Sequence, residues 1–208
     1  MRWCETAEQL CPVRELGDGL VEWALGHVTD GLFIDGGAHV GLFCIPVLLE
    51  RSAARCVAFE PNPAAYGALC EMAALNGVAD RLLAYQVALW EHDDVRTLKM
   101  PVTASSCGLS TLGEPRRFGH WKTWIVLAAT LDSYNLAPQL VKLDLEGAER
   151  YALEGARATL RAHHPALIVE AYAPNTAQFG YEPGEIGRFL EGLGYCCQQG
   201  REDLLCTT

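Results

Sequence analysis

The stretch Gly31 to Gly41, GLFIDGGAHVG, constrains the fold of this chain more than any other part of the sequence. Residues 32–35 are apolar until the final Asp35, a pattern that predicts a short buried strand with a carboxylate at its end. Three glycines then bracket a tight turn: Gly36, Gly37 and Gly41. The apolar run Val40 to Leu49 predicts a helix after the turn. This order of strand, glycine turn and helix is how a doubly wound α/β sheet presents a nucleotide-like ligand.

The alternation of strands and helices continues along the chain and predicts a single α/β domain spanning residues 1–208. The further expected strands are Arg55–Glu60, Leu82–Leu89, Ile125–Leu131, Gln139–Leu145 and Ala166–Glu170, with Val95–Met100 as an antiparallel addition. The expected helices are Ala64–Asn76, Glu149–His163 and Pro183–Leu193, followed by a hairpin of Tyr195–Gln199 and Glu202–Thr207. We expect residues 30–208 to form a Rossmann-like core, and residues 1–29 a helical cap that packs on the sheet or covers the cleft. Ser105–His120 is expected to be a loop.

Composition narrows the class of protein. Half of the 208 residues are hydrophobic, which predicts a sizeable core, and the net charge of −10 argues against a nucleic-acid partner. A local basic cluster consists of Arg116, Arg117, His120 and Lys122. The nine cysteines are odd in number and include no CxxC pair, so we expect free thiols. With neither a leader nor an apolar run of about 20 residues, the sequence favours a cytoplasmic protein without a membrane span.

Acidic residues stand at the ends of four predicted strands: Asp35, Glu60, Asp144 and Glu170. The carboxyl ends of parallel strands share one edge of a sheet, and ligands bind there in open α/β folds. Helix N-capping is the alternative role for any one of these carboxylates. Glu60 follows Gly36 by 24 residues, close to the spacing at which an acidic residue accepts hydrogen bonds from a ribose diol.

The glycine turn differs from the dinucleotide fingerprint at one position. GGAHVG reads G-x-A-x-x-G, so Ala38 replaces the glycine that admits a pyrophosphate. Asp35 stands just before the turn, where a pyrophosphate needs a site without negative charge. A ligand with a positive charge, a ribose and no phosphates suits this turn better, and S-adenosylmethionine has these properties.

The chain resembles the FkbM-type family of S-adenosylmethionine-dependent methyltransferases from about Leu32 to Glu170. The segments that carry the resemblance are FIDGGAHVG, VAFEPNP, the TLD of Thr130 to Asp132, and VKLDLEGAE from Val141 to Glu149. The resemblance implies a Rossmann-like class I methyltransferase fold: a mostly parallel seven-stranded sheet, helices on both faces and a C-terminal antiparallel hairpin. It also implies O-methylation of a hydroxyl on a small molecule, such as a sugar or secondary metabolite.

The resemblance also assigns the cofactor site. The implied binding residues are Asp35, Gly36, Gly37, Ala38, His39, Gly41, Glu60, Pro61, Asn62 and Asp144. Glu60 would hold the ribose, with Asn62 beside it. His39 departs from the family pattern, in which asparagine is usual; both side chains can donate a hydrogen bond.

Methylation of a hydroxyl requires a group that accepts its proton. The candidates near the strand ends are Asp144, Glu146 and Glu170, with His39 beside the cofactor loop, and we favour Asp144 together with Glu146. The alternative is structural: both carboxylates organise the turn and pair with Lys142, a cation in an otherwise apolar strand. A further hypothesis is that Asp144 and Glu170 bind Mg²⁺, which prefers oxygen ligands.

Three other functions compete with the methyltransferase hypothesis. An NAD(P)-dependent oxidoreductase is disfavoured by Ala38 and by the absence of a Tyr-x-x-x-Lys motif. A nucleic-acid methyltransferase is disfavoured by the acidic balance and by the lack of an Asn/Asp-Pro-Pro-aromatic motif. A non-catalytic S-adenosylmethionine-binding protein would keep the same cleft, and only measured turnover separates it from an enzyme.

Overall fold

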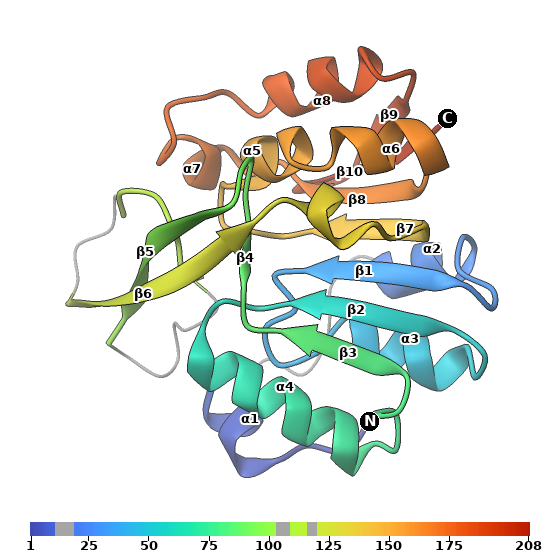
Figure 1. The fold of residues 1–208 in the computed structure, drawn as a ribbon, viewed down its shortest axis with the longest axis vertical. Helices are drawn as coiled ribbons and strands as arrows, with labels where there is room; N and C mark the ends of the chain where they lie inside the picture. The colour runs from blue at the N-terminus through green and yellow to red at the C-terminus, as the bar shows by residue number, and fades with distance from the viewer. Residues whose placement is uncertain (11–18, 103–108, 116–119) are drawn as a thin grey trace.

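A seven-stranded, mostly parallel sheet forms the centre of the molecule, as expected (Figure 1). The computed structural model describes residues 1–10, 19–102, 109–115 and 120–208. The strand order is β3-β2-β1-β7-β8-β10-β9, and only β10 runs opposite to the other six strands. The bounds of these strands are β1 Leu32–Gly36, β2 Arg55–Phe59, β3 Leu82–Tyr85, β7 Pro138–Leu143, β8 Ala166–Glu170, β9 Cys196–Gln199 and β10 Asp203–Thr207.

Helices cover both faces of the sheet, and each face has its own hydrophobic core. The helices are α1 Glu5–Leu10, α2 Leu20–Leu25, α3 Cys44–Glu50, α4 Pro63–Leu75, α5 Glu149–Glu154, α6 Arg157–His163, α7 Ala173–Thr176 and α8 Gly184–Glu191. One core joins α3 and α4 to the face that carries Phe33 and Leu140. The other joins α5, α6 and α8 to the face that carries Ile34 and Leu143. Alternate residues of one strand therefore enter different cores, as the two-residue period of a strand requires.

The N-terminal helices extend the first of these helical layers. Helix α1 packs on α4, where Ala7 is fully buried, and α2 packs on α3. The described residues of the predicted cap therefore pack on the helices α3 and α4. Residues 11–18 of the cap lie outside the described ranges.

A second, three-stranded sheet stands beyond the carboxyl ends of β1, β2 and β3 (Figure 1). Its strands are β4 Ala88–Leu89, β5 Asp94–Pro101 and β6 Trp121–Ala129, in the order β4-β6-β5. The expected strand Leu82–Leu89 is therefore wrong as one element, because β3 pairs with β2 while β4 pairs with β6. The antiparallel pairing of β5 with β6 confirms the addition expected near Val95–Met100. The expected loop 105–120 lies largely outside the described residues.

The expected helices α4 and α8 agree with the structure to within two residues at each end, while two others differ more, each for a local reason. Helix α3 begins at Cys44, not Val40, because Gly41 adopts a left-handed φ of +88°. The expected helix Glu149–His163 is divided into α5 and α6 at Gly155, whose missing Cβ leaves room for the carbonyl oxygen of Trp90. A Cβ at Gly155 would stand 2.0 Å from that oxygen.

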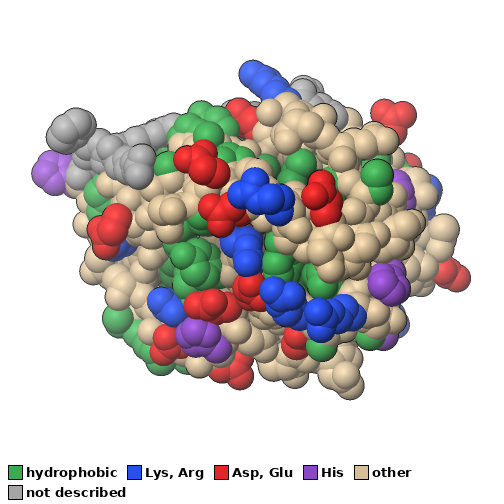
Figure 2. All heavy atoms as spheres, turned by 90° about the horizontal axis from the view of Figure 1, so that it is seen from above, with side chains coloured by type: hydrophobic (Ala, Val, Ile, Leu, Met, Phe, Trp, Pro, Cys, Tyr) green, Lys and Arg blue, Asp and Glu red, His purple; other side chains and the backbone are tan. Residues whose placement is uncertain are grey.

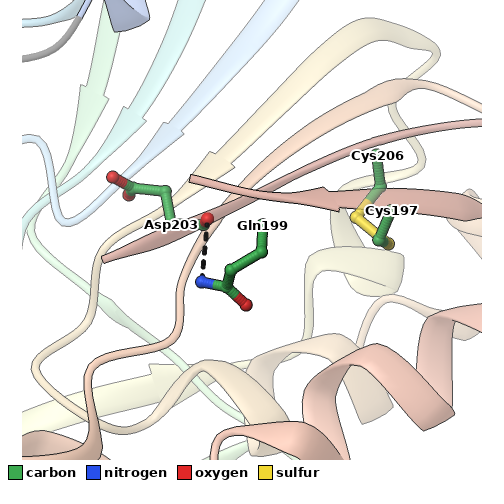
Figure 3. The surroundings of a disulfide bond; sticks show 4 residues. All are labelled: Cys197, Gln199, Asp203 and Cys206. Atoms are coloured by element: carbon green, nitrogen blue, oxygen red, sulfur yellow. Dashed lines mark hydrogen bonds between the residues drawn. A yellow bond between two sulfur atoms is a disulfide. The ribbon is translucent and has the colours of Figure 1, made fainter. Parts of the chain in front are cut away.

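The C-terminal hairpin contains a disulfide between Cys197 and Cys206, so the expectation of free thiols is wrong for these two residues (Figure 3). Antiparallel pairing of β9 with β10 places the two cysteines directly opposite each other. Their separation of nine residues does not reveal this pairing in the sequence. Cys4, Cys44 and Cys56 are free and buried, as expected. Within the described ranges, every helix is too short or too polar to cross a membrane.

The close contact at Gly155, between α5 and α6, leads to a prediction: a methyl side chain at this position destabilises the fold. We expect Gly155→Ala to lower the free energy of unfolding by about 1–3 kcal/mol, the usual cost of overpacking, because the φ of −73° is itself acceptable for alanine. The matched control is Gly67→Ala in α4, where nothing lies within 4 Å of the added Cβ; we expect a gain of about 0.5–1 kcal/mol. Urea denaturation measures the free energy of unfolding of both variants. An equal change in the two variants would contradict the packing explanation.

Candidate functional site

The turn after β1 lies against the end of β7, and glycine makes this approach feasible. Gly37 has a φ of +73°, and a Cβ there would stand only 1.8 Å from the carbonyl oxygen of Asp144. The backbone N–H of Asp144 donates to the carbonyl oxygen of Gly36 at 3.1 Å. The N–H groups of Gly37 and Ala38 both donate to the carbonyl oxygen of Phe59, at 2.9 and 3.1 Å. The turn is thereby fastened to the carboxyl ends of both neighbouring strands.

Glu60 follows the end of β2, and its carboxylate faces this turn. One oxygen accepts the backbone N–H of His39 and the other accepts the backbone N–H of Asn62, each at 2.8 Å. The side chain is buried, with 6% exposure. Burial raises its pKa to about 7, and the two backbone hydrogen bonds oppose that shift. The carboxylate is therefore rigidly oriented and ionises close to neutral pH.

His39 and Asn62 flank Glu60 from different elements. His39 has a left-handed φ of 50°, and burial lowers the pKa of its imidazole to about 4, so the ring is neutral at pH 7. Asn62 caps α4 by accepting the N–H of Ala64, and its Nδ2 donates to Ser110 at 3.1 Å. Pro61, which stands between Glu60 and Asn62 in the sequence, is half-buried.

A short strap, residues 110–113, connects the two sides of the cleft. Besides the contact of Ser110 with Asn62, the hydroxyl of Thr111 donates to the carbonyl oxygen of Glu146 at 3.3 Å. Thr111 is buried and forms a two-way backbone bridge with Lys99 in β5. The strap therefore joins the start of α4 to the turn after β7.

Lys142 in β7 lies between two carboxylates. Its ammonium is 3.4 Å from Asp35, which pairs with it across β1 and β7, and 3.2 Å from Asp144. Asp35 is completely buried, while the side chain of Asp144 is 38% exposed. Burial acts to lower the pKa of Lys142, but Asp144 and Asp35 outweigh it and hold that pKa above its usual range. The lysine is therefore charged and neutralises carboxylates inside the sheet.

The turn after β7 is held from inside by Glu149. Its Oε1 accepts the backbone N–H groups of Leu145 at 2.6 Å and Gly147 at 3.3 Å. The hydroxyl of Tyr181 donates to the carbonyl oxygen of Gly147 at 2.8 Å. Burial raises the pKa of Glu149 to about 7, and these backbone hydrogen bonds oppose the shift. This network fixes Glu146, which has a left-handed φ of 54°, in the middle of the turn.

Asn175 in α7 bridges the two remaining acidic residues. Its Nδ2 donates to Glu146 at 2.9 Å and to Glu170 at 3.0 Å. Burial raises the pKa of Glu170 to about 10, and the neighbouring Asp144 and Glu149 add to the shift. Glu170 therefore carries a proton at neutral pH.

A pocket of about 230 Å³ opens beside this bridge. Its walls come from β6, α7, the turn after β7 and the strap region, and they consist of Leu109, Pro115, Trp121, Glu146, Pro174, Asn175 and Gln178. The Oε1 atom of Gln178 is buried and has no hydrogen-bond partner among the residues that the structure describes, which is rare for a buried polar group.

The structure places the predicted residues in three groups at one edge of the sheet. Glu60, His39 and the glycine turn lie together; Asp35 pairs with Lys142 below the surface; and Glu146 joins Glu170 through Asn175. Among the described residues, no three His, Cys, Asp or Glu side chains are grouped as metal ligands, so the Mg²⁺ hypothesis gains no support.

Sequence reasoning missed Asn175, Gln178 and the strap. Asn175 follows Glu170 by only five residues, and this closeness to a strand-end carboxylate is the one signal that could have indicated it.

Comparison with known proteins decides the family. The model of the methyltransferase FkbM domain matches residues 35–197, well over half of the chain. This chain belongs to the FkbM methyltransferase family. The turn with Gly37, the Glu60 carboxylate and the Asp144 turn all lie within the FkbM match. Among curated proteins, none matches the sequence.

Solved structures show how widely the fold of this FkbM domain is shared. An FkbM methyltransferase from Methylobacillus flagellatus KT is 17% identical with a TM-score of 0.61, over 88% of this chain and 45% of that chain. A precorrin-6y C5,15-methyltransferase from Geobacter metallireducens GS-15 is 13% identical with a TM-score of 0.55, over 90% and 84%. An O-methyltransferase from Bacillus cereus in complex with SAH is 12% identical with a TM-score of 0.55, over 96% and 84%. These likenesses confirm the expected class I methyltransferase fold.

The ion pairs of Lys142 lead to a prediction about stability. We expect Lys142→Met to lower the free energy of unfolding by about 3–5 kcal/mol, because it leaves Asp35 buried without a counter-charge. Adding Asp35→Asn to the Lys142→Met variant removes the uncompensated charge, so we expect the double variant to recover part of the lost free energy of unfolding. Urea denaturation of the two single variants and the double variant measures the coupling. Strictly additive effects would show that the pair does not interact.

The raised pKa of Glu170 predicts how stability depends on pH. Between its ordinary value of 4.5 and about 10, the folded chain holds a proton that the unfolded chain has released. Stability conferred by this group therefore falls as the pH rises through that window. Glu170→Gln keeps a neutral side chain at every pH, so we expect its stability relative to the wild type to increase from pH 5 to pH 9. The exposed Glu191→Gln is the control, and parallel curves for all three proteins would refute the assignment.

Proposed function

We propose that this protein is an S-adenosylmethionine-dependent methyltransferase that acts on a hydroxyl oxygen of a small molecule. The observation that carries the proposal is the Glu60 carboxylate, which two backbone N–H groups hold at the end of β2 beside the glycine turn. Membership of the FkbM family supports the activity, and this chain corresponds to 45% of the length of the Methylobacillus flagellatus protein.

The residues of the cleft fit this cofactor. Each carboxylate oxygen has two lone pairs, so Glu60 keeps acceptor capacity for two ribose hydroxyls after binding the N–H groups of His39 and Asn62. Gly37 and Gly41 allow the tight turn that the cofactor would bind, because a Cβ at Gly37 would clash with the backbone of Asp144 and one at Gly41 with the side chains of Ile45 and Leu69. The partly exposed Asp144 presents negative charge at the next strand end, which suits a sulfonium or amino group.

Bound S-adenosylmethionine supplies an activated methyl group: the hydroxyl oxygen forms the new bond to carbon, the C–S electron pair stays on sulfur, and the hydroxyl proton needs an acceptor. Of the three carboxylate candidates, Asp144 is paired with Lys142 and Glu170 is protonated at neutral pH; His39, the fourth candidate, lies in the glycine turn beside Glu60 and is not among the walls of the pocket. Glu146 is held by Asn175 at the wall of the pocket, and we therefore assign it as the general base.

The proposed acceptor is a small molecule and not a nucleic acid. The net charge of −10 opposes binding to a phosphate backbone. On the face shown in Figure 2, the described Lys and Arg side chains lie among Asp and Glu and form no continuous basic stripe. A cytoplasmic location stays a prediction from the sequence, and the Cys197–Cys206 disulfide, a bond rare in reducing compartments, speaks against it.

Calorimetric titration with S-adenosylhomocysteine tests the cofactor assignment. Two hydrogen bonds to a charged acceptor contribute roughly 1.5–3 kcal/mol each, so we expect Glu60→Ala to weaken binding at least a hundredfold. Glu50→Ala, an exposed residue at the end of α3, is the control. Titration with NAD⁺ and NADP⁺ completes the test, and binding of either in place of S-adenosylhomocysteine would overturn the proposed function.

The same titration has a predicted pH dependence. Because the pKa of Glu60 is about 7, the ionised acceptor predominates above pH 7 and is lost as the pH falls below it. We expect tighter binding of S-adenosylhomocysteine at pH 8 than at pH 6. This difference should vanish in Glu60→Ala; its persistence there would assign the dependence to another group.

A further inference from the structure

The Cys197–Cys206 disulfide joins two strands that are anchored very differently. Strand β10 lies inside the sheet, between β8 and β9, while β9 is the outermost strand at one edge. In β9 the side chain of Cys197 is partly buried, whereas those of Cys196, Gln198 and Gln199 are exposed. Strand β9 therefore has a single side chain packed against the core, and the disulfide holds that side chain in place.

The bridge stands where the ladder between β9 and β10 has no backbone link of its own. The N–H of Gly200 donates to the carbonyl oxygen of Asp203 at 2.7 Å, so these two residues form a hydrogen-bonded pair. In an antiparallel ladder such pairs alternate with pairs that exchange no hydrogen bond. The observed register makes Cys197 and Cys206 a pair of the second kind, with Cα atoms 4.1 Å apart. The disulfide is therefore the direct link between the strands at this point (Figure 3).

The two sulfur atoms of the bridge differ in access. Cys206 is completely buried, in the core that β10 shares with α8. Cys197 is half-buried and belongs to the edge strand. A thiolate attacks a disulfide along the line of the S–S bond, from the side opposite the sulfur that leaves, and access decides which sulfur reacts. Attack at Cys197 comes from the open edge of the sheet, whereas attack at Cys206 would have to come through the core.

Opening of the bond leaves both cysteines in acceptable surroundings. Cys206 becomes a free buried thiol, as Cys44 and Cys56 already are, and such a thiol packs as a small apolar residue. Strand β10 keeps its pairing with β8, and its Leu204 remains buried. Strand β9 is then held by its backbone ladder to β10 and its contact with α8. Opening the bond therefore weakens the attachment of β9 and leaves β10 in place.

We propose that this disulfide is a thiol-exchange site, at which a low-molecular-weight thiol attacks the sulfur of Cys197 and thereby releases β9 from the sheet. The attacking thiolate forms a bond to that sulfur, the S–S bond breaks, and its electron pair goes to the sulfur of Cys206, which takes up a proton. A second thiolate frees Cys197 and forms the disulfide of the small thiol. The protein disulfide is thus reduced and two small thiols are oxidised. This inference goes beyond the proposed function and does not depend on it.

Incubation of the folded Cys196→Ser variant with reduced glutathione tests the point of attack. The substitution removes the exposed thiol beside Cys197. After free thiols are blocked with N-ethylmaleimide in acidic urea, trypsin cleaves after Arg188 and Arg201 and separates the peptide with Cys197 from the peptide with Cys206. We expect at least about tenfold more glutathione on the Cys197 peptide.

Three results of this experiment would overturn the proposal. The first is an equal distribution of glutathione between the two peptides, and the second is a bond that glutathione opens only in the unfolded chain. The third is the absence of a link between the two peptides before glutathione is added.

Hydrogen–deuterium exchange of the oxidised and the reduced protein tests the release of β9. We expect the amides of β9 to exchange at least about tenfold faster after reduction, because the closed loop of nine residues no longer restricts the open strand. The amides of β8 and β10 should stay unchanged. Cys197→Ser without a reductant should match the reduced wild type, while Cys70→Ser, an exposed position in α4, should match the oxidised one. Unchanged exchange in β9, or equal acceleration in β10, would contradict the release.

Calorimetry with S-adenosylhomocysteine separates this inference from the proposed function. The glycine turn and Glu60 lie at the ends of β1 and β2, and β7 and β8 stand between β1 and β10. We therefore expect the same affinity in both redox states. A loss of affinity on reduction would show that the opening is not confined to β9 and would overturn the proposal. If neither state binds S-adenosylhomocysteine, the proposed function fails, while thiol exchange is decided by the peptide and exchange measurements.

Discussion

The ion pairs of Lys142 hold the centre of this molecule together. An ammonium inside a sheet is unfavourable unless carboxylates pair with it, and here the buried Asp35 of β1 and the partly exposed Asp144 after β7 both do so. The pairing joins β1 to β7, the two strands whose ends form the middle of the cleft. Because Gly37 lies against the backbone of Asp144, the orientation of the glycine turn depends on the same two strands. One buried cation thus positions both the turn and the adjacent carboxylate.

Much of this arrangement could be predicted from the sequence, because local patterns determine it. The apolar run ending at Asp35, the glycines that follow and the strand ending before Glu60 each predict their structure without distant contacts. The parallel register then brings the strand ends to one edge, so the neighbourhood of Glu60 and the glycine turn follows from topology. The ion pairing of Lys142 could also be predicted from the sequence, because a cation in an apolar strand requires a partner of opposite charge.

Features that depend on contacts between distant segments could not be predicted. The division of the helix at Gly155 follows from a contact with the backbone of Trp90, 65 residues earlier in the chain. The disulfide depends on the register of β9 against β10. Asn175 lies in the four-residue helix α7, whose sequence Ala-Pro-Asn-Thr has no amphipathic period, and Gln178 lies in the turn that follows it; their roles arise from the position of this segment beside the turn after β7.

The strap has a consequence for how two ligands would share the cleft. Ser110 contacts the cap of α4, and the next residue, Thr111, contacts the backbone of Glu146, so neighbouring residues are bonded to opposite walls. A shift of either wall is transmitted through a single peptide unit to the other. If binding of one ligand raises the affinity for the second, binding of the second raises the affinity for the first by the same factor. We therefore expect each ligand to change the affinity for the other by the same factor, with the strap as the element that couples them.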